Sequence, residues 1–163
     1  MNPFLDFVIT AIPLGITFLF GCVGEILTEK VGHLNLGIPG IMCMGTAGGC
    51  LGVSLYMNGL ASPSDASWGL LVLVSLLFSM AFAAALGGVY GLLTVTLRCN
   101  QNITGLTLTT FGLGVYFFVG NGLKAIGWPI MGDYSGIKNG FANLPIPVLS
   151  QIPLLGDGLF NHN

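Results

Sequence analysis

The sequence predicts an all-α protein, a polytopic transmembrane helical bundle of about four spans with a broken or re-entrant segment near residues 30–40. Charged residues make up only 6% of the chain and hydrophobic residues 53%, whereas a soluble domain carries about 25% charged residues. Uncharged runs long enough to cross a bilayer core of roughly 30 Å recur along the chain, at residues 7–24, 34–64, 66–97 and 99–123. No basic patch favours nucleic acid, so the composition indicates a membrane protein.

The first predicted span covers residues 7–28. The amino-terminal end lacks the positive region of a secretory signal and carries Asp6 instead, so we expect this span to be retained as an anchor. Glu25 and Glu29 lie at positions i and i+4 near its end, which places both carboxylates on one helical face. The first span is therefore expected to end in an acidic face.

Residues 24–40 (GEILTEKVGHLNLGIPG) combine charged side chains with helix-breaking residues. Gly32, Gly37, Pro39 and Gly40 fall close together here. Glycine weakens a helix interior and proline removes a backbone donor, so we expect one helix to end near residues 30–32 and the next to begin near Pro39. Non-helical backbone at membrane depth is tolerated only where protein or a water-filled cavity covers it, which makes this joint the first candidate for a functional site.

Small residues recur at helix-packing spacing in the next two predicted spans, residues 39–56 and 66–97. Gly45 and Gly49 form a G-x-x-x-G pair in the second span, and Gly87 and Gly91 form another in the third. Such pairs let two helix backbones approach closely. We therefore expect these four glycines to serve helix packing.

A polar link that contains Arg98, Asn100 and Gln101 separates the third span from the fourth, residues 103–121. The fourth span carries four threonine hydroxyl groups, those of Thr104, Thr107, Thr109 and Thr110. We expect these hydroxyl groups to bond to backbone carbonyls or across helices. Beyond the fourth span, Gly, Pro, Asn and isolated charges dominate. The predicted organisation is a transmembrane region over residues 1–121 and an extramembrane loop or tail over residues 122–163.

The joint and the polar link resemble the permease subunits of bacterial ABC importers for nucleosides and simple sugars, the branched-chain amino acid/ribose-type permease family. The family motif is matched here by Gly24, Glu25, Thr28, Glu29, Lys30, Gly32, Asn35, Leu36, Gly37 and Gly40. Two positions depart from it: Pro39 stands where the family usually has Glu, and His33 where an apolar residue is usual. The resemblance covers nearly all of this chain but only the amino-terminal half of a typical member, which implies a truncated half.

The resemblance implies a multi-pass protein of the bacterial plasma (inner) membrane that forms part of a translocation path. Its partners would be membrane lipid, a second permease subunit, cytoplasmic ATP-binding subunits and an extracytoplasmic solute-binding protein. No G-x-x-x-x-G-K-[ST] loop occurs, so the chain is not itself the ATPase. The sequence predicts no enzyme, no catalytic residue, no metal site and no cofactor.

The predicted site is the helix break, where Glu25, Glu29, Asn35, Gly37 and Gly40 would shape the substrate path. The polar link of Arg98, Asn100 and Gln101 would face the cytoplasm.

Two interpretations of the acidic pair stay open. The carboxylates of Glu25 and Glu29 line or brace the path, or they mark the membrane–water boundary and tie down the break through hydrogen bonds to Asn35 and nearby amides. His33 is expected to be a hydrogen-bond partner, with a proton relay as the other interpretation. For the whole chain, the alternatives are a stand-alone oligomeric channel or secondary carrier, and a non-transporting scaffold subunit.

Overall fold

The fold is that of a computed structural model, which describes residues 3–60 and 66–128. The described part consists of α1 (Pro3–Lys30), α2 (Ile38–Asn58), α3 (Trp68–Gly91), a π-helical turn (Leu92–Thr96) and α4 (Gln101–Ala125). Within these residues no strand occurs. The all-α prediction is therefore confirmed, and so is the interruption near residues 30–40, because α1 ends at Lys30 and α2 begins at Ile38.

Three helical segments within the described residues are long and apolar enough to cross a membrane: Ile38–Asn58, Gly69–Thr96 and Gln101–Ala125. Helix α1 has 28 residues, and its run from Phe7 to Gly24 carries no charge. The predicted span limits differ from the helix ends by a few residues, since α4 continues to Ala125. The predicted tail beyond residue 128 lies outside the described residues.

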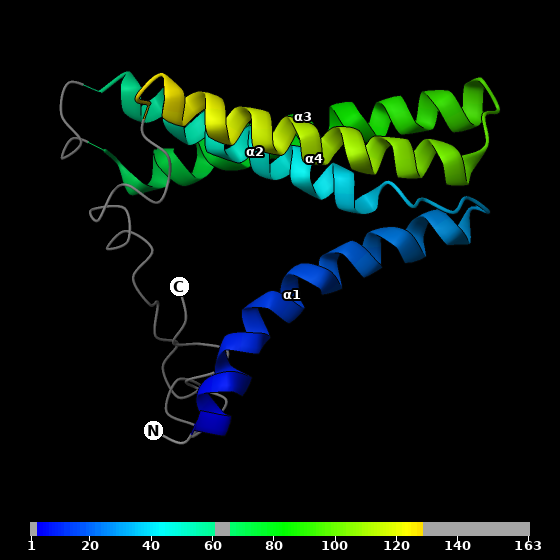
Figure 1. The fold of residues 1–163 in the computed structure, drawn as a ribbon, viewed down its shortest axis with the longest axis horizontal. Coiled ribbons are helices and arrows are strands. Elements are labelled where there is room, and N and C mark those ends of the chain that lie inside the picture. The colour runs from blue at the N-terminus through cyan, green and yellow to red at the C-terminus, as the bar shows by residue number, and fades with distance from the viewer. Residues whose placement is uncertain (1–2, 61–65, 129–163) are drawn as a thin grey trace.

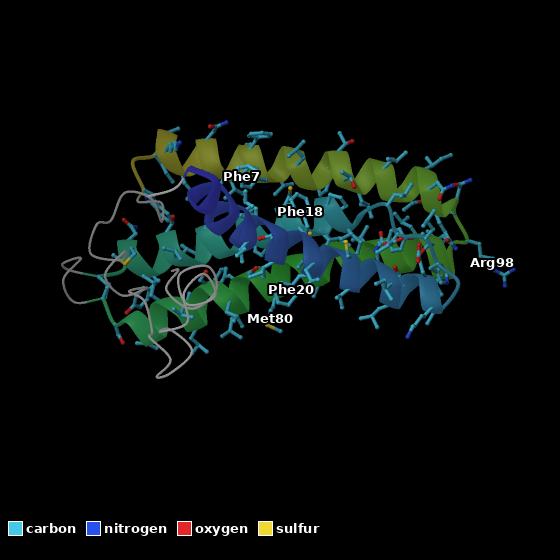
Figure 2. The ribbon with its side chains drawn as sticks, turned by 90° about the horizontal axis from the view of Figure 1, so that it is seen from below. Phe7, Phe18, Phe20, Met80 and Arg98 are labelled. Atoms are coloured by element: carbon cyan, nitrogen blue, oxygen red, sulfur yellow. The ribbon has the colours of Figure 1, made fainter. Side chains whose placement is uncertain are left out.

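Helices α2, α3 and α4 lie side by side, whereas α1 meets them at one end only and then diverges (Figure 1). Helix α1 approaches α2 in its carboxyl-terminal part, where a Cβ added at Gly21 would lie 3.0 Å from the Met42 sulfur. Farther toward its amino end, α1 exposes large apolar side chains, among them Phe7, Phe18 and Phe20 (Figure 2). The compact part of the chain is therefore the α2–α3–α4 bundle.

Two apolar clusters hold this bundle together. One lies between α2 and α3 and comprises Val53, Met57 and Leu71. The other joins α3 to α4 next to the helix break, where Leu86, Tyr90 and Leu108 are buried. The second cluster places Tyr90 within reach of the segment that connects α1 to α2.

Candidate functional site

The end of α1 is a Schellman turn built on a glycine. Gly32 has a backbone φ of +82°, the left-handed region that glycine adopts without a steric penalty. The Gly32 amide donates to the Glu29 carbonyl at 2.9 Å, and the His33 amide donates to the Thr28 carbonyl at 3.0 Å. This pair of bonds satisfies the last carbonyls of the helix and reverses the chain, so the interruption of the helix is a local consequence of Gly32.

Glu25 and Asn35 brace the segment after this turn. The Glu25 carboxylate accepts a hydrogen bond from the Asn35 backbone amide at 2.9 Å. The Thr28 hydroxyl donates to the Glu25 backbone carbonyl at 2.8 Å and lies 3.3 Å from the second carboxylate oxygen. Asn35 is only 5% exposed, and its side-chain oxygen accepts from the Gly37 amide at 2.9 Å, forming an Asx turn. Glu25 therefore ties α1 to the break, and Asn35 shapes the chain just before α2.

Three side chains from α3 and α4 complete the bracing. Tyr90 donates its hydroxyl to the Leu34 carbonyl at 2.7 Å, and Thr109 donates its hydroxyl to the Leu36 carbonyl at 2.7 Å. Gln101 accepts from the Leu34 amide at 2.8 Å through its side-chain oxygen. Unpaired backbone groups are costly away from water, so these bonds allow a non-helical segment to persist between two long apolar helices.

Glycines bring the backbones of α2 and α4 into direct contact beside the break. A Cβ added at Gly40 would overlap the Leu108 carbonyl, and one added at Gly112 would overlap the Gly40 carbonyl. One added at Gly105 would lie 2.9 Å from the amides of both Gly37 and Leu36. Because backbone atoms cannot rotate away as side chains can, α2 and α4 are interlocked at this end.

A groove of about 630 Å³ runs between α1 and the start of α2. Its walls are mostly apolar, with polar groups at the end nearest the break, and they include Phe18, Glu25, Glu29, Asn35, Met42 and Thr46. Glu29 is exposed and has no side-chain hydrogen bond or ion pair to any residue that the structure describes. The two carboxylates thus differ, since Glu25 is engaged in holding the break and Glu29 presents a carboxylate to the groove.

The polar link between α3 and α4 lies at the same end of the bundle as the break. Arg98 adopts a positive φ of 53° and extends away from the helices (Figure 2). Asn100 caps α4, because its side-chain oxygen accepts from the amides of Asn102 and Ile103. Gln101 contacts the break itself, so the structure brings together two regions that were predicted separately.

The glycines predicted to serve packing behave differently from one another. Gly45 and Gly49 face α3, where an added Cβ would lie 3.3 Å from the hydroxyls of Ser79 and Ser75, respectively. A Cβ at Gly91 would meet nothing within 4 Å in the described part, and one at Gly87 would meet only a methyl group at 3.9 Å. The packing role predicted for Gly87 and Gly91 therefore has no tight partner among these residues.

Sequence reasoning missed Tyr90, Gly105 and Gly112 as parts of this site. The search for small residues used a four-residue spacing, whereas Gly105 and Gly112 lie seven apart on α4, the spacing of two turns on one helical face. That spacing could have identified the pair. Nothing local to α3 could have assigned Tyr90 to Leu34, because the two residues are 56 positions apart.

The cysteines are unpaired. Cys22 and Cys99 are exposed, whereas Cys43 and Cys50 are partly buried. Among the described residues, no three His, Cys, Asp or Glu side chains lie close enough together to hold a metal ion.

Comparison with known proteins places the chain in a family. The family model described as branched-chain amino acid transport system/permease component matches residues 6–143. A putative glucose ABC transporter permease protein, TsgC13 of Haloferax volcanii, is 30% identical over 146 residues, which are 87% of this chain and 37% of that protein. The guanosine ABC transporter permease protein NupQ of Bacillus subtilis is 29% identical over 154 residues, 93% of this chain and 42% of that protein.

An uncharacterised Mycoplasma pneumoniae protein, the MG121 homologue, is 31% identical over 111 residues, 66% of this chain and 34% of its own length. No solved structure matches the chain. The chain thus spans about two fifths of the length of the relatives TsgC13 and NupQ. With the family model covering residues 6–143 and three membrane-length apolar helices in the described part, the protein belongs to the branched-chain amino acid transport system/permease component family and is a multi-pass plasma-membrane protein.

Proposed function

We propose that the chain forms part of the translocation path of an ATP-binding-cassette importer that carries a nucleoside or a simple sugar. The observation that carries the proposal is the braced helix break beside an open groove. Transporters use such interrupted helices to present backbone groups and polar side chains to a solute at membrane depth. The names of the relatives support the substrate class, since one is called a guanosine permease and another a putative glucose permease.

Within the groove, Glu29 is the carboxylate available to a solute. A carboxylate accepts hydrogen bonds from neighbouring hydroxyl groups, such as those of a sugar or a ribose ring. The aromatic side chain of Phe18 and the hydroxyl of Thr46 line the same groove. Glu25, Asn35, Gly37 and Gly40 shape the path indirectly by holding the break in place.

The partners proposed for the chain are a second permease subunit, cytoplasmic ATP-binding subunits and an extracytoplasmic solute-binding protein. In this assembly the nucleotide state shifts the permease between two arrangements by differential binding. The interlocked glycines make α2 and α4 one rigid unit. We therefore place the motion between α1 and that unit, where Gly32 and the Glu25–Asn35 bond form the connection.

The test replaces Asn35 with Leu in cells that carry the intact transporter. Leucine has nearly the same size but cannot accept the Gly37 amide, so the start of α2 loses its Asx turn. We expect uptake of labelled guanosine or glucose to fall at least about tenfold, the equivalent of roughly 1.4 kcal/mol, when normalised to membrane-inserted protein. The control is Asn58→Leu, an exposed position at the far end of the same helix.

Unchanged uptake by Asn35→Leu would mean that the break does not shape the path. Uptake that persists after removal of the ATP-binding subunits would contradict the importer itself and favour a channel or secondary carrier.

A further inference from the structure

The side-chain amide of Gln101 makes two hydrogen bonds to the helix break. Its oxygen accepts from the Leu34 backbone amide at 2.8 Å, and its nitrogen lies 2.9 Å from Nδ1 of the His33 ring. Gln101 is the first residue of α4. One side chain at the start of α4 therefore hydrogen-bonds to two consecutive residues of the segment that joins α1 to α2.

The direction of both bonds is determined by the backbone. The Leu34 amide can only donate, so the atom that faces it must be the Gln101 oxygen. The NH₂ group then faces His33 and can only donate, so Nδ1 must be the acceptor. An imidazole that accepts at Nδ1 is the neutral tautomer with its proton on Nε2.

We propose that His33 and Gln101 form a proton-sensitive clasp in which Gln101 positions the α1–α2 break, and in which protonation of His33 opens the clasp. A protonated imidazole carries N–H donors at both nitrogens and has no acceptor for the Gln101 NH₂ group. Rotating the amide by 180° presents its oxygen to His33 but turns the NH₂ group toward the Leu34 amide. Either orientation satisfies one bond and sets two donors against each other at the second.

His33 is accessible to protons because its side chain is only half-buried. Histidine is the side chain that ordinarily changes charge between pH 5 and 8, and this is the pH range over which the clasp is tested. The response is local, because the Thr109–Leu36 bond and the glycine contacts between α2 and α4 do not involve His33.

The other titratable and charged groups at this end of the helices and in the α3–α4 link are Glu25, Glu29, Lys30, Tyr90, Arg98 and Cys99. The Glu25 carboxylate accepts from the Asn35 amide, and the Tyr90 hydroxyl donates to the Leu34 carbonyl. Glu29, Lys30 and Arg98 are exposed. The described contacts of these groups thus leave the Gln101 amide as the hydrogen-bond partner of the His33 ring.

The test is nuclear magnetic resonance of the isotope-labelled 163-residue chain in lipid nanodiscs, and it does not depend on the proposed transport function. Ring ¹⁵N shifts at neutral pH should show Nδ1 without a proton. Acidification from about pH 7.5 to about pH 5.5 should lower the protection of the Leu34 amide, corrected for intrinsic exchange, by roughly threefold to tenfold, the equivalent of one hydrogen bond. The Ile41 amide, which bonds to the Gly37 carbonyl, should keep its protection and serves as the control for folding.

Two variants make the assignment specific. His33→Leu should remove the pH dependence at Leu34. Gln101→Glu should reverse its sign, because a carboxylate accepts from the Leu34 amide and from a protonated imidazole at the same time. A proton on Nδ1 at neutral pH would overturn the proposal. So would an unchanged acid loss in His33→Leu, or a loss of protection at low pH in Gln101→Glu.

Discussion

Replacement of Gly40 by Ala is the sharpest perturbation of the contact that holds the break against α4. The added Cβ would lie 2.5 Å from the Thr109 Cα and 2.8 Å from the Leu108 carbonyl carbon. Carbon atoms in contact normally stay about 3.5–4.0 Å apart. Because backbone atoms lie on both sides of the contact, a change of side-chain rotamer cannot relieve the overlap, and the two helices must separate by about 1 Å.

We expect Gly40→Ala to lower the free energy of unfolding by about 3 kcal/mol, the upper end of the usual cost of overpacking. Separation of the helices also stretches the Thr109–Leu36 hydrogen bond, which measures 2.7 Å. The measurement is equilibrium unfolding of the chain in mixed detergent micelles, followed by circular dichroism. The matched control is Gly114→Ala on α4, where an added Cβ meets nothing within 4 Å in the described part of the chain.

Gly114→Ala should be neutral or slightly stabilising, because alanine favours a helix over glycine by up to about 1 kcal/mol. Equal stability of the two variants would refute the interlock of α2 with α4. A loss of the same size in both variants would refute it as well, because Gly114 has no close neighbour in the described part of the chain and Gly40 does.

Two further predictions concern the turn and its bracing. Gly32→Ala should lower the free energy of unfolding by about 1 kcal/mol, because the φ of +82° disfavours a Cβ. The control is Gly15→Ala, inside α1 with open space around it, which should not lower the free energy of unfolding. Equal effects of the two variants in the same unfolding assay would contradict the Schellman turn. Tyr90→Phe should cost about 1 kcal/mol by leaving the Leu34 carbonyl without its 2.7 Å donor. Tyr116→Phe, at an exposed side chain, is the matched control, and a cost shared by both variants would argue against the Tyr90 bond.

The sequence by itself determined the class of protein and the position of the helix break. A charged content of 6% together with long uncharged runs indicates segments that lie in lipid, and this follows from composition alone. The break is likewise local, since Gly32 accepts the left-handed turn and Pro39 disfavours continuation of a helix arriving from residue 30. The role of Asn35 as an Asx turn also acts over only two residues.

Only the tertiary structure decided which side chains hold the break and which glycines bring helices together. Tyr90, Gln101 and Thr109 lie 56, 67 and 73 positions from the backbone groups that they bind. The G-x-x-x-G spacing of Gly87 and Gly91 predicted packing, yet an added Cβ there has no close neighbour in the described part of the chain, whereas Gly40 and Gly112 bring the backbones of α2 and α4 into contact. The reason is physical: spacing along a helix fixes which residues share a face, but the rotation of each helix about its axis decides which face meets a neighbour, and that rotation depends on all the helices at once.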